Sequence, residues 1–164
     1  MLSSPAMQTN KPFHIVLIEP EIPPNTGNIG RLCAATGSHM HLVGKLGFSI
    51  DDKQVRRAGL DYWPYVKLHC WDSLEQLQTE YPDGRYWYMS KKAERNYTQV
   101  EFEEGDFLVF GKETLGLPEE LLDQVGNQAL RIPIFTPHVR SLNLANSAAI
   151  ILFEALRQTG QLEE

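Results

Sequence analysis

The chain contains 164 residues, of which 42% are hydrophobic and 10% aromatic, and its formal net charge is −6. This length and composition suit one globular domain with its own core. The sequence contains no apolar run of about eighteen residues, which is the length that a membrane-spanning helix needs. The two cysteines, Cys33 and Cys70, show neither a metal-binding spacing nor a disulfide framework, so we expect a protein of the reducing cytoplasm. Residues 1–12 lack the apolar centre of a signal peptide, so we expect a flexible tail at 1–12 and a single domain at 13–160.

The predicted strands and helices alternate along the chain. Apolar runs predict strands at residues 13–18, 39–43, 65–70, 85–90, 106–110 and 129–134. Helices are predicted at residues 25–36, 51–59 and 72–81, after Pro118, and from Ser141 or Asn143 to about Gly160. Asn25 or Thr26 is the expected N-cap of the first helix. This alternation is typical of parallel βαβ units with both faces of the sheet covered, so the fold class is α/β.

The last predicted helix has no ordinary solvated stripe. Between Leu142 and Leu156 its only charged residue is Glu154. A helix that is apolar on all sides must be covered by more than one surface. We therefore expect this helix to pack on the sheet of its own chain and on a second copy, which predicts a homodimer.

One segment of the chain is basic although the net charge of the whole chain is negative. The segment 31–67 carries a net charge of +3, so the remainder of the chain carries −9. Lys and Arg bind the phosphates of nucleic acids, so this segment is compatible with local contact to RNA. A solvated charged surface explains the same pattern equally well.

Two loops follow predicted strands and carry glycines. The loop at 19–31 contains neither G-x-G-x-x-G nor a G-K-[ST] phosphate loop, which disfavours a dinucleotide site. Arg31 can project from the edge of the sheet where α/β sites lie, although a surface salt bridge is the alternative. In the loop at 111–118, Gly111 permits close approach of a ligand and Gly116 a tight bend. Its amides could bind a flat heterocycle, or the loop could be an ordinary βα turn, and Glu113 could be a site carboxylate or merely exposed.

A third segment, 140–146, places several polar residues close together at the start of the last predicted helix. Ser141 and Asn143 could each be a helix cap. Capping accounts for one polar residue, but Arg140 and Asn146 lie in the same segment. We therefore expect this end of the helix to belong to a functional site.

Together, the three segments resemble the motifs of a known family. Residues 25–31 read Asn-x-Gly-Asn-x-x-Arg, residues 110–118 read Phe-Gly-x-Glu-x-x-Gly-Leu-Pro, and Ile-Pro at 132–133 is followed by Arg-Ser-Leu-Asn-Leu at 140–144. In order and spacing, this set resembles the SPOUT knotted RNA methyltransferases, over residues 13 to 158. The opening at 19–28 and the segment 56–62 resemble the TrmL group, which methylates the ribose of the wobble nucleotide of tRNA.

This resemblance implies a fold and a cofactor. Members of the family form homodimers and pass the C-terminal helix through a preceding loop, which makes a deep trefoil knot, although knots are rare. They bind S-adenosylmethionine in a bent conformation and use no metal. By motif position, the cofactor-binding residues implied here are Met89, Gly111, Ile132, Ser141 and Leu142.

The resemblance also implies an in-line transfer of a methyl group to a ribose 2′-hydroxyl, in a pocket that aligns donor and acceptor. Arg31 corresponds to the arginine assigned to the target nucleotide, and we expect it to clamp a phosphate because a guanidinium stays charged. With Arg31, the implied catalytic residues are Ser141 and Asn143, which would orient the acceptor. The implied substrate-binding residues are Asn25, Arg31, Arg56, Arg57, Glu113 and Arg140.

Two features depart from the family pattern. Ala145 stands where members commonly have a serine, and the loop at 135–139 lacks the usual small polar residues. A knotted RNA-binding protein without activity therefore stays an alternative, as does 2′-O-methylation of another position of tRNA or of rRNA. A nucleotide-dependent oxidoreductase is disfavoured by the missing glycine fingerprint.

Overall fold

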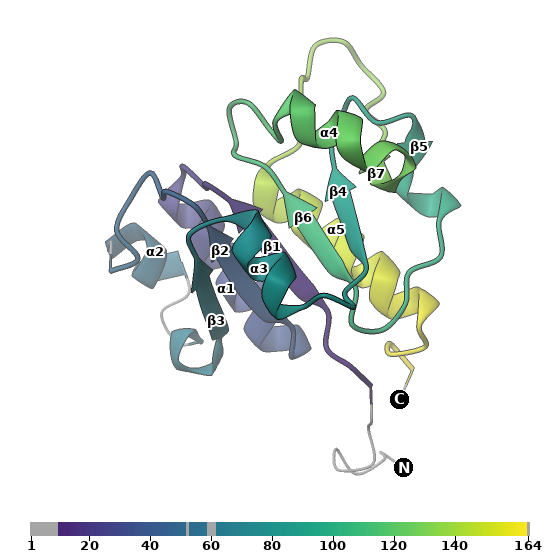
Figure 1. Cartoon of the computed structure of the whole chain (residues 1–164). Coiled ribbons are helices and arrows are strands. Elements are labelled where there is room, and N and C mark those ends of the chain that lie inside the picture. Colours follow the sequence, from purple (N-terminus) through teal and green to yellow (C-terminus); the bar gives the residue numbers. More distant parts are fainter. Residues whose placement is uncertain (1–9, 52, 59–61, 164) are drawn as a thin grey trace.

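The computed structural model of the protein describes residues 10–51, 53–58 and 62–163. Residues 1–9 of the expected tail lie outside the described part, as do the side chains of Gln54, Arg56 and Ala58. The strands are β1 His14–Ile18, β2 His39–Val43, β3 Lys67–Trp71, β4 Tyr86–Met89, β5 Arg95–Asn96, β6 Phe107–Phe110 and β7 Ala129–Arg131. They form one sheet in the order β3-β2-β1-β6-β4-β7-β5, with all neighbouring strands parallel (Figure 1).

The helices follow the strands as the sequence predicts, which confirms the α/β class. They are α1 Pro23–Thr36, α2 Lys53–Ala58, α3 Leu74–Glu80, α4 Glu119–Val125 and α5 Leu144–Gln158, with short 3-10 turns at η2 Trp63–Tyr65, η3 Tyr97–Gln99 and η4 Gly126–Gln128. Two strands differ from the prediction. The two-residue strand β5 is too short to show an apolar alternation. The last strand ends at Arg131 rather than at residue 134, where Pro133 has no N–H to donate to a neighbouring strand.

The expected cap of the first helix is wrong. The N-cap of α1 is Ile22, and Pro23 and Pro24 occupy its first turn. Proline suits this position because its fixed φ is helical and the N–H that it lacks would have no partner within the helix. Asn25 and Thr26 are therefore helical residues, and both are buried. The amides at this helix start are instead satisfied from another loop, as described below.

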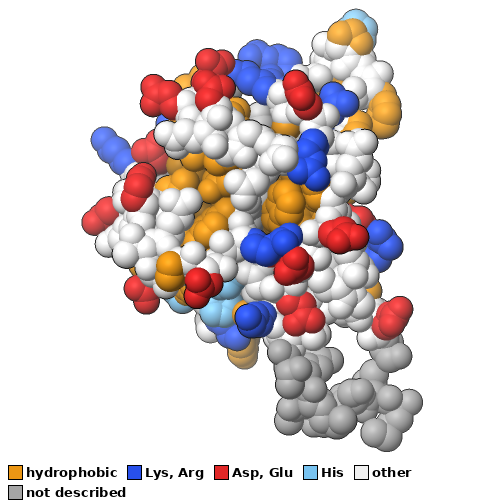
Figure 2. All heavy atoms as spheres, turned by 45° about the vertical axis from the view of Figure 1, so that its right-hand side comes forward, with side chains coloured by type: hydrophobic (Ala, Val, Ile, Leu, Met, Phe, Trp, Pro, Cys, Tyr) orange, Lys and Arg blue, Asp and Glu red, His pale blue; other side chains and the backbone are white. Residues whose placement is uncertain are grey.

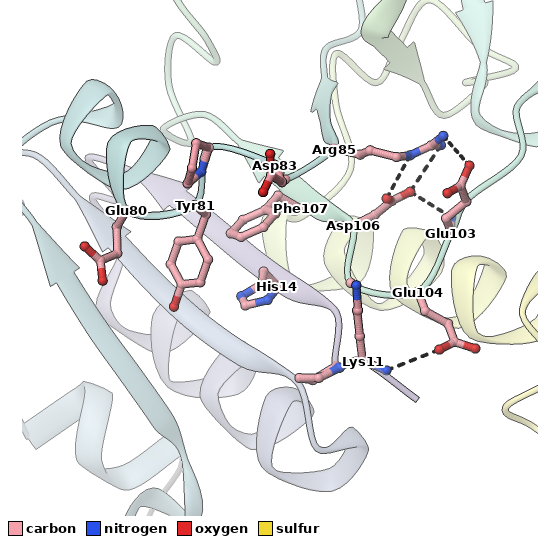
Figure 3. Close-up of a pocket in the computed structure, with 14 residues that line it drawn as sticks. Lys11, His14, Glu80, Tyr81, Asp83, Arg85, Glu103, Glu104, Asp106 and Phe107 are labelled. Carbon is pink, nitrogen blue, oxygen red and sulfur yellow. Dashed lines mark hydrogen bonds and ion pairs between the residues drawn. The ribbon is translucent and has the colours of Figure 1, made fainter. Parts of the chain in front are cut away.

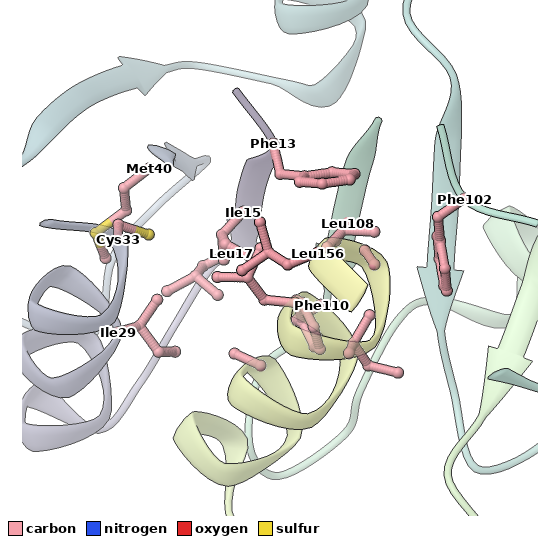
Figure 4. Close-up of a cluster of buried hydrophobic side chains, with 14 of the residues drawn as sticks. Phe13, Ile15, Leu17, Ile29, Cys33, Met40, Phe102, Leu108, Phe110 and Leu156 are labelled. Atoms are coloured by element: carbon pink, nitrogen blue, oxygen red, sulfur yellow. The ribbon is translucent and has the colours of Figure 1, made fainter. Parts of the chain in front are cut away.

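The helices cover the two faces of the sheet in pairs. The helices α1 and α5 lie on one face, and α3 and α4 lie on the other (Figure 1). Side chains alternate along β1, so Ile15 and Leu17 face α1 and α5, whereas Val16 faces the other layer. Figure 4 shows the hydrophobic cluster between the sheet and the helices α1 and α5, with Ile29 of α1 and Leu156 of α5 directed toward β1. These two apolar layers fix the positions of the loops at the carboxyl edge of the sheet.

Helix α5 is apolar on its buried side and partly apolar on its open side. Its buried residues are Ala148, Ile151, Leu152, Ala155 and Leu156, which pack on the sheet and on α1. Phe153, which lies on another side of the helix, is 43% exposed. The chain alone therefore covers one face of the helix and leaves a large apolar side chain at the surface. Among the described residues, the structure contains no helix with the length and apolar character needed to span a membrane.

Candidate functional site

A cavity of about 580 Å³ lies at the carboxyl ends of β4, β6 and β7. The three strands contribute Met89, Gly111 and Ile132 at or just after their last residues, and the segment before α5 contributes Ser141 and Leu142. The structure thus brings all five residues expected to bind the cofactor to one cavity. Carboxyl ends of parallel strands are where α/β proteins place their sites.

Gly111 is required by the loop itself. A Cβ atom at this position would lie 2.1 Å from the carbonyl carbon of Gly116 and 2.3 Å from the backbone nitrogen of Leu117. The loop folds back on itself because the Gly116 N–H donates to the Lys112 carbonyl at 2.8 Å, and Gly116 adopts a φ of 69°. The sequence suggested that Gly111 allows a ligand to approach, but the group closest to it is the backbone of its own loop. Gly111 therefore shapes the wall of the cavity.

Glu113 anchors the start of α1. Its Oε1 accepts a hydrogen bond from the Glu21 N–H at 2.8 Å, and its Oε2 accepts from the Ile22 N–H at 2.9 Å and from Nδ2 of Asn25 at 3.2 Å. A helix start has amides without partners and a partial positive charge, so a carboxylate is favoured there. Glu113 supplies from the β6–α4 loop the cap that Ile22 cannot provide. Glu113 is therefore not merely exposed: it lines the cavity and holds the two loops together.

The loop before α1 also supplies a carboxylate to the β6–α4 loop. Oε1 of Glu21 accepts hydrogen bonds from the N–H of Thr114 at 3.0 Å and from its Oγ1 at 2.7 Å. These bonds lower the pKa of the Glu21 carboxyl. Lys112 also lies 3.3 Å from Glu19. Reciprocal contacts of this kind fix the first glycine-containing loop against the second.

Asn143 connects the third segment to the other two. It is the N-cap of α5, because its Oδ1 accepts from the N–H groups of Ala145 at 2.8 Å and Asn146 at 3.2 Å. Its Nδ2 donates to Oδ1 of Asn25 at 3.0 Å, and Asn25 in turn donates to Glu113. An amide NH₂ has two hydrogens, so one donor of Asn143 remains for a ligand. Asn25, Glu113, Arg140 and Asn143 all line the cavity.

Several lining residues were not predicted from the sequence. Ser90, Lys91 and Lys92 follow β4 and line the cavity, and Lys92 pairs with Glu119 at 2.8 Å. Ser147 also lines it, one helical turn after Asn143. The sequence could have indicated both sets. Residues that directly follow the carboxyl end of a parallel strand lie where α/β proteins place their sites, and residues four apart on a helix lie on the same side of it. Within the described part of the chain, no group of three His, Cys, Asp or Glu side chains is placed to hold a metal ion.

Arg31 and Arg57 do not line the cavity. Arg31 is exposed on α1, and its guanidinium lies 4.8 Å from the centroid of the Tyr62 ring, which is a cation–π contact. Arg57 is exposed on α2, which packs against α1, and the side chain of Arg56 lies outside the described residues. The structure thus separates the predicted site into a cavity and an exposed basic surface on α1 and α2.

Ala145 does not line the cavity either. Its side chain is partly buried and packs against the core between the sheet and α5. The side chain at this position therefore belongs to the core and not to the lining of the cavity.

A second cavity, of about 490 Å³, lies at the opposite edge of the sheet, away from the three segments (Figure 3). There, Arg85 lies 3.0 Å from Asp106 and also pairs with Glu103, and Asp106 accepts from the indole N–H of Trp87 at 2.8 Å. Burial raises the pKa of the Asp106 carboxyl, against the effect of these partners. Because Arg85, Glu103 and Asp106 are engaged with one another, this part of the cavity has the character of a structural ion-pair network.

Known proteins share this sequence and fold. A family model described as "SpoU rRNA Methylase family" matches residues 12–153. A protein of Saccharophagus degradans named tRNA (cytidine(34)-2′-O)-methyltransferase is 51% identical over 152 residues, which cover 90% of this chain and 96% of that protein. A protein of the same name from Methylovorus glucosotrophus is 50% identical over 147 residues, covering 89% and 95%.

Solved structures agree with these matches. A structure described as "Structural insights into the 2-OH methylation of C/U34 on tRNA" superimposes with a TM-score of 0.85, at 43% identity, over 90% of this chain and 96% of that chain. The SpoU methyltransferase AviRb of Streptomyces viridochromogenes, solved in complex with AdoMet, superimposes with a TM-score of 0.81 at 21% identity, over 93% of this chain and 62% of that chain. At that identity, the second likeness supports the fold alone.

Proposed function

Because this chain belongs to the SpoU rRNA methylase family, we propose that it methylates the ribose 2′-hydroxyl of the wobble cytidine or uridine in the tRNA anticodon loop. The relatives named for this reaction at cytidine 34 are about half identical over nearly the whole chain. The observation that carries the proposal is the convergence of three distant segments on one cavity, through the contacts of Asn25, Glu113 and Asn143.

The cavity fits S-adenosylmethionine in size and in chemistry. Its volume lies in the range of cofactor sites, and its walls combine apolar side chains with backbone amides. We propose that Met89, Ile132 and Leu142 contact the adenine and that the backbone near Gly111 and Ser141 binds its polar edge. When bound there, this cofactor supplies an electrophilic methyl group for attack by the ribose oxygen.

Ser141 and Asn143 are the proposed positioning groups for the acceptor. Both line the cavity, and Asn143 keeps one amide hydrogen that is not used by the cap or by Asn25. Its orientation is fixed by three hydrogen bonds, so this donor points in a defined direction. A fixed donor aligns the acceptor for an in-line transfer, which requires reacting atoms about 3 Å apart.

Arg31 suits the RNA backbone better than the cofactor. It lies outside the cavity, on the exposed side of α1, where a polyanion can reach it. We propose that Arg31 clamps a phosphate next to the target nucleotide, with Arg56 and Arg57 extending the basic surface and Arg140 binding substrate at the cavity mouth. Helix α1 packs beside α5, so pairing two copies through α5 would also place Arg31 near the interface.

The architecture proposed with this function follows the family. We propose that the described elements belong to one methyltransferase domain at residues 13–160 after a tail at 1–12, that α5 passes through a deep trefoil knot, and that two copies pair through α5. The exposed Phe153 supports the pairing, because it leaves an apolar group at the surface of the helix. A cytoplasmic location is proposed from the tRNA substrate.

The proposal is tested by methyl transfer to purified tRNA together with calorimetry of cofactor binding. The wild-type protein is expected to transfer methyl groups from S-adenosylmethionine. The substitution Arg31→Ala is expected to abolish transfer while leaving the Kd for the cofactor within about twofold. Lys67→Ala, which removes an exposed cation at the start of β3, away from α5 and from the cavity, serves as the control and should retain activity. Unchanged turnover of Arg31→Ala would remove Arg31 from the mechanism, and an inactive wild-type protein that binds both partners would refute the function.

A further inference from the structure

The loop between β7 and α5 carries the most exposed large hydrophobic side chain among the described residues. Phe135 is 95% exposed, whereas Ile132 and Ile134 on the same loop line the cavity. In Figure 1 the loop rises beyond α4, and in Figure 2 it forms the projection at the top, with hydrophobic and histidine side chains near its end. Both faces of this ring are therefore open to solvent and available to stack against a partner.

The shape of this loop is set by its sequence. Pro133 and Pro137 restrict the backbone on either side of Phe135, and Oγ1 of Thr136 accepts a hydrogen bond from the His138 N–H at 3.2 Å. Phe135 is therefore presented on a restricted loop, so a partner that covers it loses less conformational entropy on binding.

The charge around Phe135 identifies the chemistry of the partner. From Arg131 to Asn143 the sequence contains no acidic residue, although the whole chain has a net charge of −6. Arg131, at the end of β7, and Arg140, on the loop, are both exposed, and within the described part of the chain neither makes an ion pair shown by the structure. Side chains of Lys and Arg lie near the base of the projection, together with Asp or Glu side chains (Figure 2). An exposed aromatic ring on a segment that carries cations and no acids suits single-stranded RNA, whose bases stack on aromatic rings while phosphates bind arginine.

We infer that Phe135 stacks on the base of a nucleotide flanking the acceptor nucleotide and thereby positions the RNA over the cavity. The inference rests on the proposed function, because the two arms of this loop line the cavity proposed for the methyl donor. Phe135 is a substrate-binding residue in this account. It takes no part in binding the cofactor, since it does not line the cavity.

The test compares Phe135→Leu with Phe135→Trp in full-length protein. Leucine keeps an apolar side chain without a π-face, and tryptophan keeps the face. Stacking of a base on an aromatic ring corresponds to roughly a 5- to 100-fold change in affinity. We expect Phe135→Leu to raise KM for tRNA by at least about fivefold with kcat nearly unchanged. Phe135→Trp should keep the wild-type KM, and neither change should alter the Kd for S-adenosylmethionine or the oligomeric state.

A thermodynamic cycle identifies the stacked base. Binding of an anticodon stem–loop RNA is measured by fluorescence anisotropy, with the flanking nucleotides made abasic one at a time. Removing the stacked base should weaken binding to the wild-type protein and have no effect on Phe135→Leu. The inference is overturned if Phe135→Leu binds RNA as tightly as the wild-type protein. It is also overturned if, at both flanking positions, the losses of affinity caused by the substitution and by the abasic nucleotide simply add, or if Phe135→Leu dissociates a dimer.

The same measurements separate this inference from the proposed function. If the wild-type protein binds the RNA but transfers no methyl group, the proposed activity is wrong and the binding cycle still decides the role of Phe135. If the wild-type protein methylates tRNA while Phe135→Leu is equivalent to it in both assays, only the inference is wrong. A wild-type protein that binds no RNA would refute both.

Discussion

At the scale of single residues, the site is a network in which most polar groups have structural duties. Glu113 accepts three hydrogen bonds, two of them from backbone amides at the start of α1. Asn143 uses its carbonyl oxygen for two backbone amides of α5. The residues that resemble catalytic motifs therefore also assemble the loops, and changes at these positions must be judged by stability as well as by rate.

Replacement of Glu113 tests its anchoring role. Glu113→Ala leaves the amides of Glu21 and Ile22 without their acceptor, and we expect the free energy of unfolding to fall by about 1–3 kcal/mol. Urea denaturation measures this change. Glu119→Ala, which removes an exposed carboxylate paired with Lys92, is the control and should cost less than about 1 kcal/mol. Equal effects of the two substitutions would argue against a special role for Glu113.

Asn143 permits a separation of capping from positioning. Asn143→Ser keeps an N-cap oxygen and loses the amide hydrogens, whereas Asn143→Ala loses both. We expect Asn143→Ala to lower the free energy of unfolding by about 1–2 kcal/mol, and Asn143→Ser to lower it less. Both should reduce the methyl-transfer rate, measured at a temperature where each variant is folded. A serine variant with the wild-type rate would show that Asn143 acts only as a cap.

At the scale of elements, the sequence predicted those whose pattern is strong. The five helices and six of the seven strands follow from apolar periodicity, and α1 ends at Thr36 as predicted, followed by Gly37 in the αL conformation. The cap of α1 was mispredicted because its acceptor, Glu113, lies 91 residues away from Ile22 in sequence. Local rules for caps cannot show a carboxylate supplied by a distant loop. The strand β5 was missed for a similar reason, since its two residues are placed by pairing with β7.

The sequence also predicted part of the candidate site. Motif resemblance located Met89, Gly111, Ile132 and the segment 140–143, and all of them meet at the cavity. It could not separate Arg31 from that cavity, because the direction of a side chain on α1 depends on how the helix packs. The sequence also could not show that Gly111 is enforced by the backbone of Gly116.

The open face of α5 gives a prediction at this scale. If two copies pair through α5, Phe153→Glu would bury a charge in the interface, which is strongly unfavourable. We expect this variant to sediment as a monomer in analytical ultracentrifugation where the wild-type protein sediments as a dimer. Leu162→Glu changes an exposed apolar residue beyond the helix and is the control. A Phe153→Glu variant that remains dimeric would place the interface elsewhere.

At the scale of the whole molecule, four histidines on neighbouring strands couple stability to pH. His14, His39, His41 and His69 lie on one face of β1, β2 and β3. The Trp71 indole donates to Nδ1 of His41 at 2.9 Å, so the proton of His41 is on Nε2, which lies 2.8 Å from Nδ1 of His14. Both rings are therefore held neutral. Burial, followed by the neighbouring histidines, lowers the pKa of His14 to about 3 and that of His41 to about 2.

This arrangement predicts acid sensitivity. In the unfolded chain these rings take up protons below about pH 6.5, whereas in the folded chain they stay neutral, so protons favour unfolding. Stability is fully present above pH 6.5 and is lost as the pH falls from there toward 3, by about 1 kcal/mol per pH unit for each ring. Denaturation at pH 7.5 and pH 5.5 measures this slope. His14→Phe, which keeps a ring against Phe107, should make this slope shallower.

The account depends on one reaction at one nucleotide, and nucleoside mapping tests it most directly. Purified protein is incubated with tRNA and S-adenosylmethionine, and the modified nucleosides are located by mass spectrometry of the digested RNA. We predict one added methyl group, on the 2′-oxygen of the wobble cytidine or uridine. A methyl group on a base or at another position, or no methyl group while tRNA and cofactor are both bound, would contradict the account.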